Sequence, residues 1–290
     1  WLSAEGIEKA GRQIIKHFKT HDVKTQNILV LGQCTTNWLC NCLTASAFAV
    51  GMSVMATEGQ YDNVMQELMA AASSDVKYDA VVLLPWNTRL LAEGDRDTQQ
   101  RIDDEITFWQ QAWNFVNNQL NTRLIQIGYD YKSPGYQGHH LGGQAGGHIN
   151  LVRQVNEALR ANLPEMSFFV DIDQISGMLG RENFYDARRY YWTKQPFSEV
   201  GTARLSEHVF AAYRTMVNGP KKVLVLDLDN TVWGGVVGET GPLGIGIGDS
   251  PDGEAHRALQ RYAKSLQNKG ILLAVCSKNN DTDAREPLEK

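Results

Sequence analysis

The stretch Val223–Thr231 reads Val-Leu-Val-Leu-Asp-Leu-Asp-Asn-Thr, a short apolar run that leads directly into two carboxylates. The leucine and β-branched side chains predict a buried strand. Asp227 and Asp229 are two residues apart, so in an extended chain they emerge on one side at the carboxyl end of that strand. Adjacent carboxylates repel each other unless a cation or a shared proton relieves them, which favours a divalent metal and phosphate chemistry. The alternative is a strand that ends in a polar turn beginning at Asn230.

A second strand signal favours the first interpretation. Residues 270–279 read Gly-Ile-Leu-Leu-Ala-Val-Cys-Ser-Lys-Asn, and residues 253–269 carry apolar side chains three or four positions apart. The latter spacing predicts a helix between the two strands. Strand, helix and strand form one right-handed parallel unit. This unit brings Ser277 beside Asp227, where its hydroxyl can bind a phosphoryl oxygen.

These residues resemble the haloacid-dehalogenase-like phosphotransferase superfamily. The run from Asp227 to Thr231 matches its first motif and Ser277 its second. The resemblance implies that Asp227 is a nucleophile that forms an aspartyl-phosphate and that Asp229 is the general acid and base. It also implies Mg²⁺, held by the Asp227 carboxylate and the Asp229 backbone carbonyl. Thr231, Ser277 and Lys278 are the candidates for contacts with the phosphoryl group.

The same superfamily uses a later lysine and a later acidic pair. Neither motif lies between Ser277 and Lys290. We therefore expect the chain to be a piece of a longer protein whose phosphatase half is incomplete here. We also expect it to have little or no phosphatase activity.

Bulk properties limit the class of protein. A length of 290 residues allows two domains. The net charge of −5 argues against nucleic acid as the main partner. We expect neither a membrane span nor a secretory signal, because no apolar run is long enough and no basic leader precedes one. The four cysteines fit neither a zinc ribbon nor a disulfide framework, which favours the reducing cytoplasm.

Strands and helices alternate along the first 217 residues. This alternation predicts an α/β fold with a parallel sheet covered on both faces. We expect a domain boundary at residues 218–221, with domains at 1–218 and 221–290. The glycine-rich segment 133–147 is predicted to be a loop. Predicted strands cover 27–31, 52–57, 80–84, 123–127 and 166–171, and predicted helices cover 5–19, 37–49, 63–72, 97–120, 149–163 and 198–217.

Cys34 lies in the turn Gly32-Gln-Cys-Thr-Thr36, between the first of these strands and a helix. The N–H groups of a helix N-terminus favour the thiolate, so we expect a lowered pKa for Cys34. The same N–H groups can bind the oxyanion of an acyl intermediate. This arrangement suits a nucleophile for acyl transfer. The alternative is that Cys34 is a small buried apolar residue.

Gly59 and Asn87 follow the second and third predicted strands, and therefore fall at the same edge of the sheet as Cys34. This spacing resembles the sequence blocks of the SGNH (GDSL-type) hydrolase fold. There a glycine N–H and an asparagine side chain complete the oxyanion hole beside the nucleophile. Cys34 stands in place of the usual serine, which suits acyl transfer to another thiol.

The last block of that fold supplies Asp-x-x-His, whereas this chain has Asp186-Ala-Arg-Arg189. The general base is therefore open. His148 is preferred to His208 because a loop beside a site can act as a lid. Asp186 can orient a base or bind substrate hydroxyls. Arg188 and Arg189 can bind a phosphate, with surface salt bridges as the alternative.

An SGNH-like domain with a cysteine, followed by the two phosphatase motifs, resembles the FkbH-like family. Its members are bifunctional glyceryl transferase/phosphatases of polyketide assembly lines. The resemblance is most specific at residues 222–239 and 270–279. It implies that 1,3-bisphosphoglycerate acylates Cys34 and releases phosphate, and that the phosphatase half removes the 3-phosphate. The glyceryl group then passes to the phosphopantetheine thiol of an acyl carrier protein, beside other polyketide synthase domains.

Three functions remain open at this point. The first is acyl transfer to a carrier protein through Cys34. The second is a Mg²⁺-dependent phosphatase with an accessory domain. The third is a non-catalytic piece that docks a carrier protein.

Overall fold

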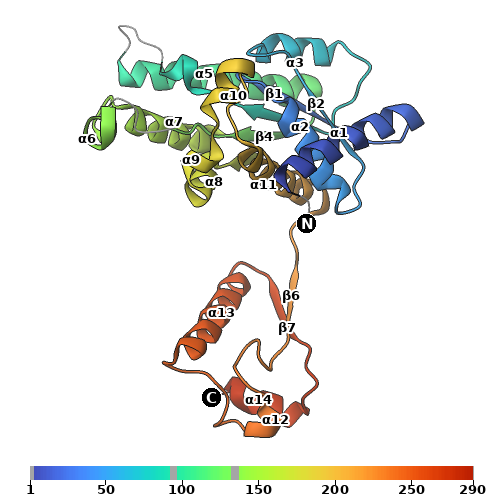
Figure 1. The fold of residues 1–290 in the computed structure, drawn as a ribbon, viewed down its shortest axis with the longest axis vertical. Helices are drawn as coiled ribbons and strands as arrows, with labels where there is room; N and C mark the ends of the chain where they lie inside the picture. Colours follow the sequence, from blue (N-terminus) through green and yellow to red (C-terminus); the bar gives the residue numbers. More distant parts are fainter. Residues whose placement is uncertain (1–2, 92–96, 132–136, 290) are drawn as a thin grey trace. The chain divides into compact units, whose positions relative to one another are not determined.

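The computed structural model describes residues 3–91, 97–131 and 137–289. The chain divides into two compact units, Trp1–Asn218 and Gly219–Lys290 (Figure 1). The sequence predicts the boundary at residues 218–221. No helix within the described ranges is long and apolar enough to cross a membrane.

The first unit is built on a sheet of five parallel strands that pair in the order β2-β1-β3-β4-β5. This confirms the predicted α/β class with a parallel sheet. The strands are β1 (Gln26–Gly32), β2 (Val54–Glu58), β3 (Ala80–Leu84), β4 (Arg123–Ile127) and β5 (Phe168–Val170).

Both faces of this sheet are buried. Along β1, Ile28 and Val30 belong to one core cluster and Leu29 and Leu31 to the other, because successive side chains point to opposite faces. Burial on both sides explains why these strands read as continuous apolar runs. One face is covered by α2 (Asn37–Phe48) and α11 (Glu199–Asn218), with α1 (Ala4–His21) packed on both, and the other by α3 (Val64–Ala72), α5 (Thr98–Phe115) and α7 (His148–Asn162).

The irregular parts of this unit differ from the sequence prediction. The predicted loop 133–147 contains the short helix α6 (Gly138–Gly143), and residues 132–136 lie outside the described ranges. The predicted helix 97–120 is α5 followed by a π-helical turn, Val116–Leu120. Four more short helices were not predicted, since four to eight residues are too few to show a periodicity. These are α4 (Asn87–Leu90), α8 (Ile172–Leu179), α9 (Arg181–Phe184) and α10 (Ala187–Thr193).

The second unit pairs β6 (Val223–Leu226) with β7 (Leu272–Val275) in parallel, as predicted. Its other elements are α12 (Val237–Thr240), α13 (Pro251–Gln267) and α14 (Asp281–Glu289). The prediction that β6 is buried is wrong, because Val223 and Val225 are exposed. The core of this unit instead consists of Leu228, Val232, Trp233 and Val237, which follow the strand.

Candidate functional site

The strand order of the first unit creates a switch point between β1 and β3. From β1 the chain moves outward to β2, and from β3 it moves the other way to β4 and β5. In open parallel sheets, ligands bind at such a point, outside the carboxyl ends of the strands. Cys34 lies in the loop that leaves β1, and Asn87 follows directly on the loop that leaves β3. The topology therefore brings these two predicted site residues to one edge.

Cys34 is only 2% exposed and contributes to the core beneath α2. Burial raises the pKa of the Cys34 thiol, and the negative charge of Asp62 adds to this effect. The predicted lowering of this pKa is therefore wrong, because loss of water outweighs the field of the helix N-terminus. In this conformation Cys34 is a protonated thiol.

The end of α10 is hydrogen-bonded to Thr35, the residue that follows Cys34. Thr35 donates its backbone N–H to the Lys194 carbonyl at 3.0 Å and its hydroxyl to the Thr193 carbonyl at 2.7 Å. On the same helix, the Tyr190 ring lies 5.3 Å from the ring of Trp86. The end of α10 thus lies over the loops that leave β1 and β3. Local sequence carries no signal for this contact, which joins residues about 160 positions apart.

The two predicted oxyanion donors are already hydrogen-bonded. The Gly59 N–H donates to the Val30 carbonyl at 3.1 Å, which extends the pairing of β1 and β2. A Cβ at Gly59 would lie 2.4 Å from a methyl carbon of Leu31, so a larger residue here would require the Leu31 side chain to shift. Asn87 is buried and donates one amide N–H to the Asp130 carbonyl. An oxyanion role for either residue stays a prediction.

Asp130 anchors a buried network at the end of β4. Its carboxylate accepts hydrogen bonds from the hydroxyls of Ser176 and Tyr185, and it pairs with Arg181 at 3.1 Å. Burial raises the pKa of Asp130, although these hydrogen bonds and Arg181 act in the opposite direction. The network ties α8 and α9 to the sheet edge that Asn87 occupies. The sequence did not reveal it, because its members are dispersed along the chain.

A second charged network starts on α4. Arg89 donates two hydrogen bonds to the Glu105 carboxylate, both at 2.7 Å. Tyr129 also donates to Glu105, and its oxygen accepts from the indole N–H of Trp109 at 2.8 Å. Asp62, the charged neighbour of Cys34, also interacts electrostatically with Arg89. This network therefore connects α4, two residues after Asn87, to the surroundings of the thiol.

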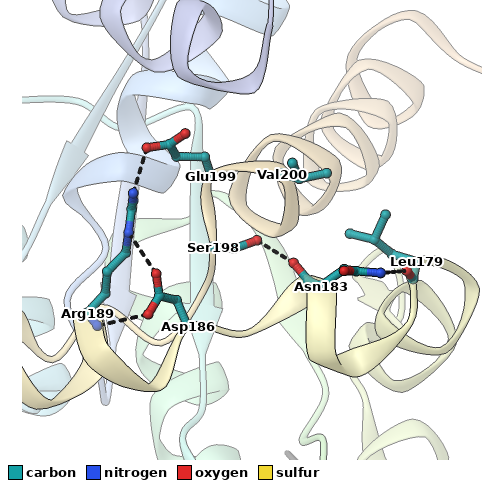
Figure 2. Close-up of a pocket in the computed structure, with 7 residues that line it drawn as sticks. All are labelled: Leu179, Asn183, Asp186, Arg189, Ser198, Glu199 and Val200. Atoms are coloured by element: carbon teal, nitrogen blue, oxygen red, sulfur yellow. Dashed lines mark hydrogen bonds and ion pairs between the residues drawn. The ribbon is translucent and has the colours of Figure 1, made fainter.

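The position where the SGNH motif has histidine is taken by an ion-paired arginine. Figure 2 shows Arg189 between Asp186 at 3.0 Å and Glu199 at 2.6 Å, and its guanidinium also stacks 4.2 Å above the ring of Trp38. These are the contacts of the salt-bridge alternative. The cavity beside them has a volume of about 370 Å³ and is lined by Leu179, Asn183, Asp186, Arg189, Ser198, Glu199 and Val200.

The remaining candidates of the first unit lie elsewhere. Exposed Arg188 stacks 4.5 Å from the ring of Trp192. His148 begins α7, where burial and then Arg101 lower its pKa, which favours the neutral imidazole. His208 is an exposed residue of α11 beside a second cavity of about 190 Å³. A general base for Cys34 is therefore not assigned by these contacts.

The paired strands of the second unit bring its predicted residues together. Leu226 pairs with Val275, so Asp227 and Ser277 follow the same end of the sheet. Asn230 has a positive φ of 54° and accepts a hydrogen bond from the Gly235 N–H, so the polar turn is present as well. Thr231 and Ser277 are half-buried and Lys278 is exposed.

Asp229 is held by three donors. One carboxylate oxygen accepts from the Trp233 indole at 2.9 Å and the Val237 N–H at 3.1 Å, and the other accepts from the Asn279 amide at 2.9 Å. Burial acts to raise the pKa of Asp229, but these hydrogen bonds outweigh it and the pKa lies below its usual value. Asp229 is therefore an ionised carboxylate near neutral pH.

The oxygen atoms at this edge fit a magnesium ion only in part. Asp227 is exposed, and one of its carboxylate oxygens accepts its neighbour's N–H at 2.9 Å. The side-chain oxygens of Asp229 are occupied by N–H donors, which leaves its backbone carbonyl as a ligand. Mg²⁺ is commonly bound through one or two carboxylates and keeps several waters, so this donor set is compatible with it. In the part of the chain that the structure describes, no three His, Cys, Asp or Glu side chains group around a possible metal position.

Fold and site together define a two-unit α/β protein with a thiol at the switch point of its first sheet. The family model of the FkbH N-terminal domain matches residues 27–209. The chain therefore belongs to this family, and the matched range contains Cys34, Gly59, Asn87 and Asp186.

One solved structure agrees with the fold over the whole chain. The N-terminal part of protein BF1531 from Bacteroides fragilis, described as containing a phosphatase domain complexed with Mg, aligns with 100% of this chain and 77% of its own at a TM-score of 0.83 and 24% identity. The salicylyl-acyltransferase SsfX3 from a tetracycline biosynthetic pathway covers 67% of this chain and 56% of its own (TM-score 0.43, 14% identity). A GDSL-like lipase from Parabacteroides merdae covers 68% and 97% (TM-score 0.38, 12% identity). The last two scores are too low to carry an argument. No curated protein matches the chain.

Proposed function

We propose that the first unit is an acyl transferase that carries a glyceryl group as a thioester on Cys34. The donor is the phosphorylated glycerate 1,3-bisphosphoglycerate, and the acceptor is the phosphopantetheine thiol of an acyl carrier protein in polyketide assembly. One observation carries the proposal. Cys34 lies at the switch point of the parallel sheet, beside the loop of Asn87, in a domain of the FkbH family.

The chemistry has two steps. The Cys34 sulfur attacks the carbonyl carbon of the acyl phosphate, the carbon–oxygen bond to phosphate breaks, and the thiol proton leaves with the phosphate or enters solvent. The carrier thiol then attacks the thioester carbon, and Cys34 recovers a proton as its bond to carbon breaks. An acyl phosphate is already activated, so the site needs a nucleophile and an oxyanion donor more than a strong base. This requirement is compatible with Arg189 in place of histidine.

The burial of Cys34 adds a condition to this proposal. A thiol that is 2% exposed cannot meet a donor and a carrier arm. The end of α10 covers its loop through two hydrogen bonds to Thr35. Acylation therefore requires a rearrangement that exposes the thiol, and we infer that release of α10 from the loop is that step. Exposure also restores water around the thiol and lowers the cost of forming a thiolate.

Intact-mass analysis tests this function. The folded wild-type protein, incubated with 1,3-bisphosphoglycerate, should gain an acyl adduct that Cys34→Ala lacks. The adduct should transfer to a holo carrier protein. Absence of any adduct on the folded wild type would overturn the proposal. Carrier binding without an adduct or turnover would instead support a docking role.

For the second unit we propose a phosphatase-related role, with removal of the 3-phosphate from the glyceryl group. Asp227 is the candidate nucleophile and Asp229 the candidate acid and base, with Thr231, Ser277 and Lys278 around the phosphoryl group. The Asp227 carboxylate and the Asp229 carbonyl would hold Mg²⁺, which would neutralise charge on phosphoryl oxygens. Mg²⁺-dependent turnover that Asp227→Asn removes and Cys34→Ala leaves unchanged would favour a phosphatase with an accessory domain. The mass of the Cys34 adduct shows directly whether the phosphate is retained.

A further inference from the structure

Gln33, the residue before Cys34, connects the two loops of the switch point. Its backbone N–H donates to the Leu84 carbonyl at 3.0 Å, and its side-chain oxygen accepts the Trp86 N–H at 2.8 Å. The residue is only 5% exposed. Gln33 is therefore fixed between the loop of the nucleophile and the loop of Asn87.

The contact with Trp86 assigns the positions of the oxygen and the nitrogen in the Gln33 side-chain amide. A backbone N–H can only donate, so the oxygen of the amide must face Trp86 and the NH₂ group must face away. That NH₂ nitrogen is buried and has no hydrogen-bond partner among the described residues. An unsatisfied buried donor costs about 1–3 kcal/mol, so a fixed one in a native fold calls for an explanation.

The acyl-transfer site supplies that explanation. The Gly59 N–H is used by the Val30 carbonyl, and Asn87 uses one of its two amide N–H bonds for the Asp130 carbonyl. Gln33 keeps both N–H bonds of its amide. Its donor is fixed on the residue that precedes Cys34 in the chain, and preorganised donors of this kind are what stabilise a developing oxyanion.

We propose that the Gln33 side-chain amide is an oxyanion donor for acyl transfer at Cys34. It donates a hydrogen bond to the carbonyl oxygen of the acyl group while sulfur adds to the carbon and the oxygen becomes negative. No bond to Gln33 forms or breaks. This assignment rests on the proposed function of the first unit.

Gln33→Met is the decisive variant, because it removes the amide donor without adding a charge beside the thiol. Gln33→Glu is a second variant that keeps an acceptor for the Trp86 N–H, although its buried carboxylate also disfavours the thiolate. In both variants, Cys34 acylation by 1,3-bisphosphoglycerate should slow by about 10²–10³-fold, the usual effect of losing one oxyanion donor. The loss should fall on the acylation rate at saturating donor rather than on the donor concentration needed for half-maximal rate.

Alkylation of Cys34 by iodoacetamide provides the control, because that displacement builds no oxyanion. The Gln33→Met protein should be alkylated at Cys34 at the wild-type rate, because the substitution adds no charge beside the thiol, and circular dichroism should show that it is folded. Wild-type acylation rates in Gln33→Met, or an equal loss of alkylation, would overturn the assignment while the proposed function stands. A folded wild type that forms no adduct would instead refute the acyl-transfer function itself, and with it this role of Gln33.

Discussion

Replacing Glu105 by alanine tests whether the network on α4 supports the site. The Glu105 side chain is 4% exposed and receives two hydrogen bonds from Arg89 and one from Tyr129. Arg89 lies two residues after Asn87 on the same short helix. Loss of Glu105 should therefore destabilise the first unit and loosen the segment that holds Asn87.

The size of the effect follows from what each partner loses. Tyr129 is 1% exposed, and without Glu105 its hydroxyl hydrogen has no acceptor, which costs about 1–3 kcal/mol. The Arg89 side chain is 40% exposed and regains water, so its share is only about 1 kcal/mol. We expect about 3 kcal/mol in total, at the lower end of the range of about 3–5 kcal/mol for breaking a buried pair, as suits the half-exposed Arg89. For a unit of this size that loss corresponds to roughly 6–12 °C in melting temperature.

Hydrogen-exchange mass spectrometry across a urea series would measure this loss separately for peptides of β3 and β4. Glu207→Ala is the matched control, because Glu207 pairs with Arg204 at the surface and both side chains are about half exposed. It should change the free energy of unfolding by no more than about 0.5 kcal/mol. If Glu105→Ala and Glu207→Ala have the same stability, the network does not support α4 and the reasoning is refuted.

Three further predictions concern thiols, acid and phosphate. In the native protein, a thiol reagent such as DTNB should react fast with Cys276, which is exposed, because the other three cysteines are buried. All four should react after unfolding. Fast reaction at Cys34 in the native protein would contradict its burial. The raised pKa of Asp130 means that the folded state binds its proton more tightly, so its stabilising contribution is complete below about pH 3.9 and is lost as pH rises through the folded-state pKa. The free energy of unfolding of wild type relative to Asp130→Asn, measured by urea titration, should therefore fall from acid to neutral pH, and a flat difference would argue against the shift. Mg²⁺-dependent hydrolysis of p-nitrophenyl phosphate by this chain should stay at the level of Asp227→Asn, because in this conformation the hydrogen bonds that lower the pKa of Asp229 keep it ionised, and its proposed role as an acid requires its release from those donors. Clear turnover above that variant would show that this release occurs.

The sequence was sufficient for features that depend on regular repetition. Apolar runs bounded by polar turns placed all five strands of the first sheet, and the parallel rule then brought Cys34 and Asn87 to one edge. It was insufficient where single long-range contacts decide the outcome. The hydrogen bonds from Thr35 to the end of α10 depend on tertiary packing, and so does the burial that reverses the pKa shift of Cys34. A helix N-terminus can be predicted from local sequence. The exclusion of water from the Cys34 thiol by tertiary packing cannot.

The kinds of side chain around Cys34 indicate which chemistry the site can support. Two amides lie on the loops beside the thiol, and those of Gln33 and Asn87 are each fixed by a backbone group of a neighbouring loop. Amide donors stabilise an oxyanion but take no proton, and the position expected for histidine holds an arginine paired with two carboxylates. An ester or amide substrate would need a base at that position to activate the nucleophile. An acyl phosphate has a good leaving group, so a buried thiol that is uncovered and supplied with amide donors suffices. These features support the proposed transfer from an activated acyl donor over hydrolysis of an ester.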